Sequence, residues 1–135
     1  MRFVDTNVLL YAVSTLPAEA AKAERARRVL AARDLVLSVQ VLSEFYVRAT
    51  RVSRPDTMTH DHAARLVTAF GRHRVQPTAL ADVQRALALR SRFSISYWDA
   101  LIVSSATAAG CDEVLTEDLQ HGQDLDGVRV VNPFR

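Results

Sequence analysis

The 135-residue sequence has little cysteine, glycine or histidine, and each scarcity argues against a class of site. The single cysteine, Cys111, cannot form an internal disulfide bond, and one thiol is too few for a zinc site built on cysteine. The four glycines fit neither a phosphate-binding loop nor a dinucleotide-binding motif. The four histidines are not spaced as metal ligands. A metal site in this chain would therefore rest on oxygen ligands.

Long hydrophobic runs are also missing. No stretch approaches the roughly 20 consecutive apolar residues that span a membrane. The N-terminus lacks the pattern of a secretion signal, because Asp5 and Asn7 interrupt its only apolar run. Hydrophobic residues make up 49% and charged residues 24%, as in an ordinary globular protein. We therefore expect one domain over residues 1–135, in the reducing cytoplasm and without membrane contact.

Lysine is almost absent, since the bases are 16 arginines and Lys22, and the net charge is +2. The planar guanidinium fork suits phosphate oxygens. Arginine is also a good helix former, and a GC-rich genome would favour it without functional cause. Charge alone therefore leaves phosphate binding open. The arginine clusters lie at residues 25–28, 48–54, 72–74 and 85–92.

Hydrophobic periodicity predicts strands that alternate with helices. Strands separated by helices pair in parallel, so the sequence predicts an α/β fold, a three-layer α/β/α sandwich around a central, mainly parallel sheet. The expected strands are Met1–Asp5, Leu35–Ser38, Arg74–Pro77, Glu113–Leu115 and Val128–Val131. The expected helices are Thr6–Tyr11, Ala18–Ala31, Val39–Arg51, His60–Phe70, Thr78–Arg92 and Tyr97–Ala109.

Asp5 lies at the end of the first strand. In parallel sheets, sites form beyond the carboxyl ends of the strands, so one interpretation is that Asp5 belongs to a group of carboxylates gathered around a metal ion. The same residue has a simpler explanation as a helix cap, and Thr6 and Asn7 beside it can hydrogen-bond the turn. Both interpretations are compatible with the sequence.

Asp118 follows the strand Glu113–Leu115 and would face the same sheet edge as Asp5. The alternative is a helix capped by Thr116, whose first turn holds Glu117 and Asp118, because acidic side chains complement the helix dipole there. The position of Asp118 alone does not choose between these interpretations.

Asp99 is the most informative acid, because it lies in the apolar stretch SYWDALIV. A helix start that is apolar on nearly all sides is expected to be buried. A lone carboxylate there is costly unless it is paired, hydrogen-bonded or bound to a cation. Ser96 can cap the same helix with Asp99 at its third position, which is compatible with a functional role.

The remaining acids carry weaker signals. Glu44 falls opposite the apolar stripe of its helix, so periodicity predicts a solvated surface residue. Other acids stand among Arg and Ala in predicted helices and are interpreted as solvated or paired surface charges. They are Glu19, Glu24, Asp61 and Asp82.

Four segments, taken in order, resemble the PIN-domain family, and within it the VapC-type ribonuclease toxins of bacterial toxin–antitoxin pairs. The segments are FVDTNVLLYA, LSVQVLSEFYV, SYWDALIVSSATAAGCDEVLTEDL and VRVVNPF. Each segment is weak alone, but the ordered set spans the chain and is specific. It comprises an Asp after the first strand, Gln-x-x-x-Glu in a helix, Trp-Asp-Ala opening a buried helix and Thr-x-Asp after the next strand.

The resemblance carries functional roles over by position. It overrides the surface prediction for Glu44, and it leaves open which of the neighbours Glu117 and Asp118 faces the metal. The implied catalytic acids are Asp5, Glu44, Asp99 and Asp118; Asp5, Asp99 and Asp118 would hold metal, and Asn7 and Thr116 would support them.

The activity that the resemblance implies is metal-dependent endoribonuclease cleavage, in which a metal-activated water hydrolyses RNA to 5′-phosphate and 3′-hydroxyl ends. Four carboxylates in one cleft repel each other unless a cation neutralises them, and oxygen ligands without His or Cys favour Mg²⁺ or Mn²⁺. The implied partners are the RNA substrate, a small cognate antitoxin protein and a second copy in a homodimer. The apolar segments Ser43–Val47 and Leu66–Phe70 would form the dimer interface or simply core.

Two alternatives compete with this hypothesis. A phosphatase of the haloacid-dehalogenase type also begins with an Asp after its first strand, but its Asp-x-Asp-x-Thr motif is broken here by Asn7 and Leu9. A PIN-like scaffold that binds RNA or protein without cutting is the other. The presence of all four acids argues against the scaffold.

Overall fold

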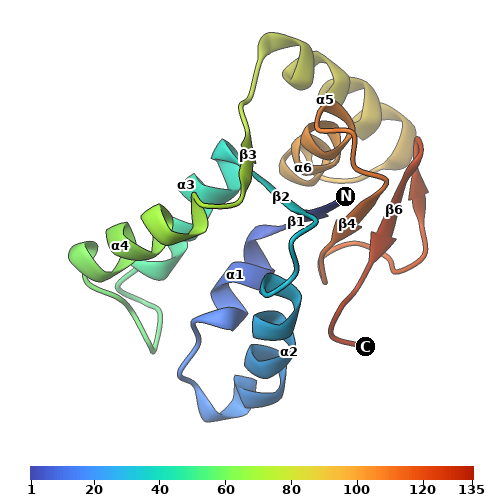
Figure 1. The fold of residues 1–135 in the computed structure, drawn as a ribbon. Coiled ribbons are helices and arrows are strands. Elements are labelled where there is room, and N and C mark those ends of the chain that lie inside the picture. The colour runs from blue at the N-terminus through green and yellow to red at the C-terminus, as the bar shows by residue number, and fades with distance from the viewer.

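A six-stranded sheet forms the centre of the protein in a computed structural model that describes residues 1–135 (Figure 1). Its strands are β1 (Arg2–Val4), β2 (Leu35–Ser38), β3 (Arg74–Gln76), β4 (Glu113–Leu115), β5 (Asp124–Leu125) and β6 (Val128–Val131). Their order across the sheet is β3-β2-β1-β4-β6-β5. Every neighbouring pair is parallel except β5 with β6. The predicted mainly parallel sheet is therefore confirmed.

Six helices alternate with the strands. Figure 1 shows the first two on one side of the sheet and the last two on the other, which confirms the three-layer arrangement. A short 3-10 turn, Pro17–Glu19, precedes the second helix. The helices are α1 (Thr6–Ala12), α2 (Ala20–Leu30), α3 (Val39–Ala49), α4 (His60–Phe70), α5 (Leu80–Phe93) and α6 (Tyr97–Ala108).

The expected elements lack one strand, β5, which forms a hairpin with the predicted strand β6. Asp126 and Gly127 both adopt positive φ values, 59° and 93°, between these two strands. An Asp-Gly pair is a strong hairpin signal, because it tolerates the left-handed backbone of a tight turn. β5 itself has only two residues, which is too short for periodicity to show.

The core fills both faces of the central strands. Phe3 and Val4 of β1 are fully buried, as expected for a parallel strand covered by helices on both sides. In α6 the whole run Ala100–Ala106 is buried, which accounts for its nearly continuous apolar sequence. This packing fixes the helix start, and with it Asp99, against the carboxyl edge of the sheet. No helix of the protein is both long and apolar enough to cross a membrane.

Asp82 corrects the prediction of a surface charge, since only 4% of the residue is exposed. Its carboxylate accepts a hydrogen bond from the Ala79 backbone N–H (2.7 Å) at the start of α5. It also pairs with Arg85 (3.1 Å), which donates to the Ser104 carbonyl of α6 (3.2 Å). Burial of this acid is therefore compensated by a cap and a cation, and it fastens α5 to α6.

Candidate metal centre

Asp5 lies directly after β1 and caps α1. Its Oδ1 accepts a hydrogen bond from the Thr6 backbone N–H (2.7 Å), and its Oδ2 accepts one from the Thr116 hydroxyl (2.7 Å). The parallel register pairs Val4 of β1 with Leu115 of β4, so the residues that follow them meet at the sheet edge. Only 5% of Asp5 is exposed. The helix cap therefore exists, and it holds a buried carboxylate in a fixed orientation.

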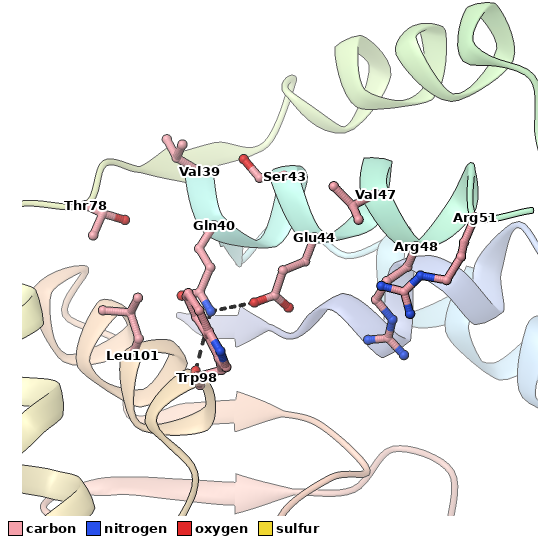
Figure 2. A pocket seen from close by; sticks show the side chains of 10 residues that line it. All are labelled: Val39, Gln40, Ser43, Glu44, Val47, Arg48, Arg51, Thr78, Trp98 and Leu101. Atoms are coloured by element: carbon pink, nitrogen blue, oxygen red, sulfur yellow. Dashed lines mark hydrogen bonds between the residues drawn. The ribbon is translucent and has the colours of Figure 1, made fainter.

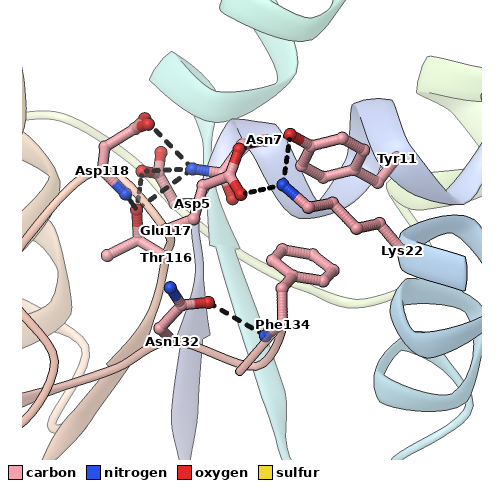
Figure 3. Close-up of polar contacts among 9 residues, drawn as sticks. All are labelled: Asp5, Asn7, Tyr11, Lys22, Thr116, Glu117, Asp118, Asn132 and Phe134. Atoms are coloured by element: carbon pink, nitrogen blue, oxygen red, sulfur yellow. Dashed lines mark hydrogen bonds and ion pairs between the residues drawn. The ribbon is translucent and has the colours of Figure 1, made fainter. Parts of the chain in front are cut away.

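Asp118 lies in a bend after β4, so the alternative interpretation, a helix capped by Thr116, is wrong. The Thr116 hydroxyl oxygen accepts instead from the Asp118 backbone N–H (3.1 Å), which shapes the bend. The Asn7 side-chain amide donates to Asp118 Oδ2 (3.0 Å) and to the Thr116 hydroxyl oxygen (3.1 Å). The two residues predicted to support the site thus connect Asp5 with Asp118 (Figure 3).

Asp99 stands in the first turn of α6, where the Ser96 hydroxyl oxygen accepts a hydrogen bond from the Asp99 backbone N–H (3.1 Å). The predicted cap is therefore present. The prediction that this helix start is buried is wrong: Asp99 is partly exposed, because α6 begins at the open edge of the sheet and its burial starts at Ala100. Trp98 beside it is 61% exposed.

The fold brings three carboxylates from distant parts of the chain together. One oxygen from each of Asp5, Asp99 and Asp118 lies within 4.8 Å of the others. Asp5 follows β1, Asp99 lies in the first turn of α6 and Asp118 follows β4. All three therefore lie at the carboxyl edge of the parallel sheet, where sites form in sheets covered by helices on both faces.

Glu44 is not part of this carboxylate triad but is joined to it through Thr6. Its carboxylate accepts hydrogen bonds from the Thr6 hydroxyl (3.0 Å) and the Gln40 side-chain amide (2.7 Å). Periodicity placed Glu44 on a solvated surface, whereas it is partly buried in a groove between α3 and α6 (Figure 2). The sequence reasoning missed Thr6 as a link, although it stands inside the Asp-Thr-Asn motif.

The triad has a large electrostatic cost in the absence of a cation. The pKa of Asp5 is raised to about 6, chiefly by burial; the charges of Asp118 and Asp99 add to the rise, and the hydrogen bonds from Thr116 and Thr6 oppose it. Burial also raises the pKa of Asp99, with added repulsion from Asp118 and Glu44. Carboxylates crowded in this way favour either a bound proton or a bound cation.

Glu117 faces away from the triad. Its carboxylate accepts hydrogen bonds from the Lys22 ammonium (2.9 Å) and from the Tyr11 hydroxyl on the other side of the loop (Figure 3). Asp118 is therefore the member of the adjacent acidic pair that joins Asp5 and Asp99. Sequence reasoning did not identify Lys22 or Tyr11, although Lys22 is conspicuous as the only lysine.

The groove between α3 and α6 has a volume of about 630 Å³, and Glu44 lines it together with Trp98 and Leu101. Arg48 lies in this groove on the same side of α3 as Glu44, and Arg51, which follows α3, lies beside Arg48 (Figure 2). Neither arginine forms an ion pair with an acid. Arg48 also borders a smaller cavity beside Asn7 and Asp118, so it stands between the groove and the triad.

The chemistry of the donor set fits a divalent cation. Three carboxylate oxygens within 4.8 Å provide hard ligands, and no histidine or cysteine belongs to the cluster. His60 is hydrogen-bonded to the Tyr46 hydroxyl (2.7 Å), and His121 accepts a hydrogen bond from the Asn132 backbone N–H (3.0 Å). Both histidines lie outside the triad. The geometry therefore suits a metal that prefers oxygen ligands.

Comparison with protein families gives one match, a model described as PIN domain, over residues 2–123. No curated protein matches the chain. The matched segment includes all of Asp5, Glu44, Asp99 and Asp118.

Solved structures with the same fold cover nearly the whole chain. A toxin–antitoxin complex from Klebsiella pneumoniae is 20% identical with a TM-score of 0.74, covering 98% of each chain. VapC20 of Mycobacterium tuberculosis, described as a Sarcin-Ricin loop cleaving toxin, is 20% identical with a TM-score of 0.68, covering 87% of this chain and 92% of that one. DNA-bound VapBC from Salmonella typhimurium is 18% identical with a TM-score of 0.66, covering 96% and 95%.

Proposed function

The chain belongs to the PIN domain family, and from this membership we propose that it is a metal-dependent endoribonuclease, the toxin of a toxin–antitoxin pair. The observation that carries the proposal is the carboxylate triad of Asp5, Asp99 and Asp118 at the carboxyl edge of the sheet. Family membership also removes the haloacid-dehalogenase-type phosphatase as an alternative.

Within this proposal, Asp5, Asp99 and Asp118 hold Mg²⁺ or Mn²⁺, directly or through water. A metal held there would lower the pKa of a coordinated water and polarise a phosphoryl oxygen. Glu44 orients the attacking water, because hydrogen bonds from Thr6 and Gln40 fix its carboxylate and leave lone pairs free to accept from water. In-line attack by that water would form a new bond to phosphorus and break the bond from phosphorus to the 3′ oxygen, which takes up a proton, so the products would carry a 5′-phosphate and a 3′-hydroxyl.

Arg48 and Arg51 are the side chains we assign to the RNA backbone. Two adjacent guanidinium groups without an acidic partner repel each other, and a phosphate between or beside them relieves that repulsion. Arg48 borders both the groove and the cavity next to Asp118, so phosphates of one strand can reach both. A single-stranded or looped RNA suits such a narrow approach. The description of VapC20 as cleaving the Sarcin-Ricin loop supports an RNA substrate.

An antitoxin and a second copy of the chain are the proposed protein partners. Similar solved structures from Klebsiella pneumoniae and Salmonella typhimurium are described as toxin–antitoxin assemblies, which supports a small cognate antitoxin. Val39 and Val47 of α3 are 49% and 54% exposed and line a second groove, between α3 and α4, and we assign this face to a homodimer. We place the assembly in the cytoplasm, where RNA is available.

The two segments for which the sequence left a dimer interface and core open both contribute to the core. Phe45 and Phe70 are buried and meet edge-to-face with ring centroids 5.1 Å apart. The exposed and half-buried residues of both segments remain for an interface, above all Val47, which is 54% exposed.

The test combines cleavage with metal binding. We expect the purified chain, freed of antitoxin, to cleave a looped RNA oligonucleotide in Mg²⁺ or Mn²⁺ and not in EDTA. Asp99→Asn should lose cleavage while its melting temperature stays within a few degrees of wild type. Calorimetry should find a Mn²⁺ site in wild type and not in Asp99→Asn. A wild-type chain without a Mn²⁺ site would support the non-catalytic scaffold, and cleavage that persists in EDTA would refute the mechanism.

A further inference from the structure

Two adjacent acids, Glu117 and Asp118, follow β4, and only one of them joins the triad. The bend after β4 presents Asp118 to the triad, while Glu117 is hydrogen-bonded to Tyr11 of α1 and Lys22 of α2. Either carboxylate offers the same hard oxygen atoms. The selection therefore comes from the groups that hold each side chain.

Glu117 is held by a closed triangle of hydrogen bonds. The Lys22 ammonium donates to Glu117 Oε2 (2.9 Å) and to the Tyr11 hydroxyl oxygen (3.2 Å), and the Tyr11 hydroxyl donates to Glu117 Oε1. Tyr11 belongs to α1 and Lys22 to α2, so two helices on one side of the sheet are hydrogen-bonded to the loop after β4. The side chains of Lys22 and Glu117 are 44% and 22% exposed, so the triangle is partly shielded from water.

Aromatic contacts hold Lys22 in place. Its ammonium lies 4.8 Å from the centroid of the Tyr11 ring and 5.8 Å from that of Phe134, distances at which a cation is attracted to a ring face. The two rings meet edge-to-face with centroids 4.9 Å apart. Phe134 is itself tied down, since its backbone N–H donates to Asn132 Oδ1 (2.9 Å) (Figure 3). The C-terminal segment thus closes the same cluster.

We propose that Lys22 is a positioning residue for the metal centre: it holds Glu117 on the far side of the loop and so keeps Asp118 turned toward Asp5 and Asp99. Asn7 and Thr116 hold Asp118 from the site side, and Lys22 holds its neighbour from the opposite side. One ammonium group reaches Glu117 and Tyr11 together while lying against two rings. The inference rests on the proposed function, in which the triad binds metal.

The main variant is Lys22→Met, with Arg28→Met as its matched control. Both residues lie on α2 and both pair with a glutamate, but Arg28 pairs with Glu24 on the exposed face. Calorimetry should show Mn²⁺ binding about 10-fold weaker in Lys22→Met, the lower end of what supporting residues of metal sites contribute. Arg28→Met should bind Mn²⁺ as wild type does.

Three further readouts separate positioning from a merely structural role. The Mn²⁺ concentration that half-saturates cleavage should rise in Lys22→Met, while kcat at saturating Mn²⁺ returns to the wild-type value. Lys22→Arg, which keeps the charge, should restore most of the affinity. Hydrogen exchange of the amides of residues 116–119 in the metal-free protein should be faster in Lys22→Met than in Arg28→Met.

The proposal is overturned if folded Lys22→Met matches Arg28→Met in both Mn²⁺ affinity and exchange of residues 116–119. Glu117→Gln serves as a second variant, because its amide keeps the size of the side chain. If Glu117→Gln lost kcat at saturating Mn²⁺ as Asp118→Asn should, Glu117 would itself be a ligand and the proposal would fail; retained kcat supports it. A wild-type chain without a Mn²⁺ site would refute the proposed function, while the exchange comparison would still decide the role of Lys22.

Discussion

Replacing Asp5 by Asn should stabilise the metal-free protein at neutral pH, although it removes a proposed metal ligand. The folded protein holds the Asp5 proton more tightly than the unfolded chain, since burial and the charges of Asp118 and Asp99 raise its pKa from 3.8 to about 6. The free energy of unfolding therefore falls as the pH rises from about 4 to about 6, and it stays low above that range. Asn carries no charge and escapes this loss.

The magnitude follows from the size of the pKa change. Each pKa unit corresponds to about 1.4 kcal/mol, so ionised Asp5 costs the metal-free protein about 3 kcal/mol above pH 6. Asn can still cap α1 through Thr6, but it accepts less well from the Thr116 hydroxyl, which costs about 1 kcal/mol. The net gain at pH 7.5 is about 2 kcal/mol, or about 5–10 °C in Tm.

The assay is thermal and denaturant unfolding of both proteins in EDTA from pH 4 to pH 8, repeated with Mn²⁺. We expect the advantage of Asp5→Asn to grow by about 2–3 kcal/mol between pH 4 and pH 7.5. Mn²⁺ at 100 times its Kd should stabilise wild type by about 2.7 kcal/mol and leave Asp5→Asn unchanged. Asp112→Asn, at an exposed acid outside the triad, is the control and should follow wild type at every pH. A stability difference between Asp5→Asn and wild type that is independent of pH would refute the reasoning.

Three other substitutions probe the remaining parts of the site. Glu44→Gln should lower kcat by about 10²–10³-fold with Mn²⁺ affinity nearly unchanged, because it orients water rather than holding metal; a large loss of Mn²⁺ binding in calorimetry would instead make Glu44 a ligand. Replacing Arg48 and Arg51 by Ala should weaken RNA binding and reduce the slope of log K against log salt by about 0.7 per lost phosphate contact, measured by fluorescence titration; an unchanged slope would place the RNA elsewhere. Val47→Glu should shift the chain from dimer to monomer in analytical ultracentrifugation, because it buries a charge in the proposed interface; a stable dimer would exclude this face.

Hydrophobic periodicity and the position of acids at strand ends were enough to predict most of the secondary structure and part of the candidate site. The alternation of apolar stripes placed the ends of nearly all helices and strands within two residues of those observed. Asp5 and Asp99 stood out because each carboxylate interrupts an apolar stretch, and a buried charge needs a compensating partner. Such features are local, since the backbone period and the cost of burying a charge are properties of short segments.

Tertiary packing overturned the interpretation of Glu44 and Asp82. Glu44 falls on the polar face of its helix, which periodicity assigns to solvent, and Asp82 stands among Arg and Ala, which predicts a surface charge. In the fold, the outer face of α3 meets α6 across the groove, and the start of α5 packs on α6. The hydrophobic pattern of a helix shows which residues lie outside its apolar stripe. It does not show whether another element of the fold covers those residues.

The sequence by itself determined the order of strands and helices and singled out Asp5 and Asp99 as candidate site residues. Both results depend only on neighbouring residues, through the hydrophobic period and the cost of burying a charge. Only the tertiary structure decided that Asp118 rather than Glu117 meets the other two carboxylates, since that choice depends on Asn7, Tyr11 and Lys22, which lie about a hundred residues away along the chain. Contacts between such distant segments arise from the packing of α1 and α2 beside the end of β4, and no local pattern encodes them.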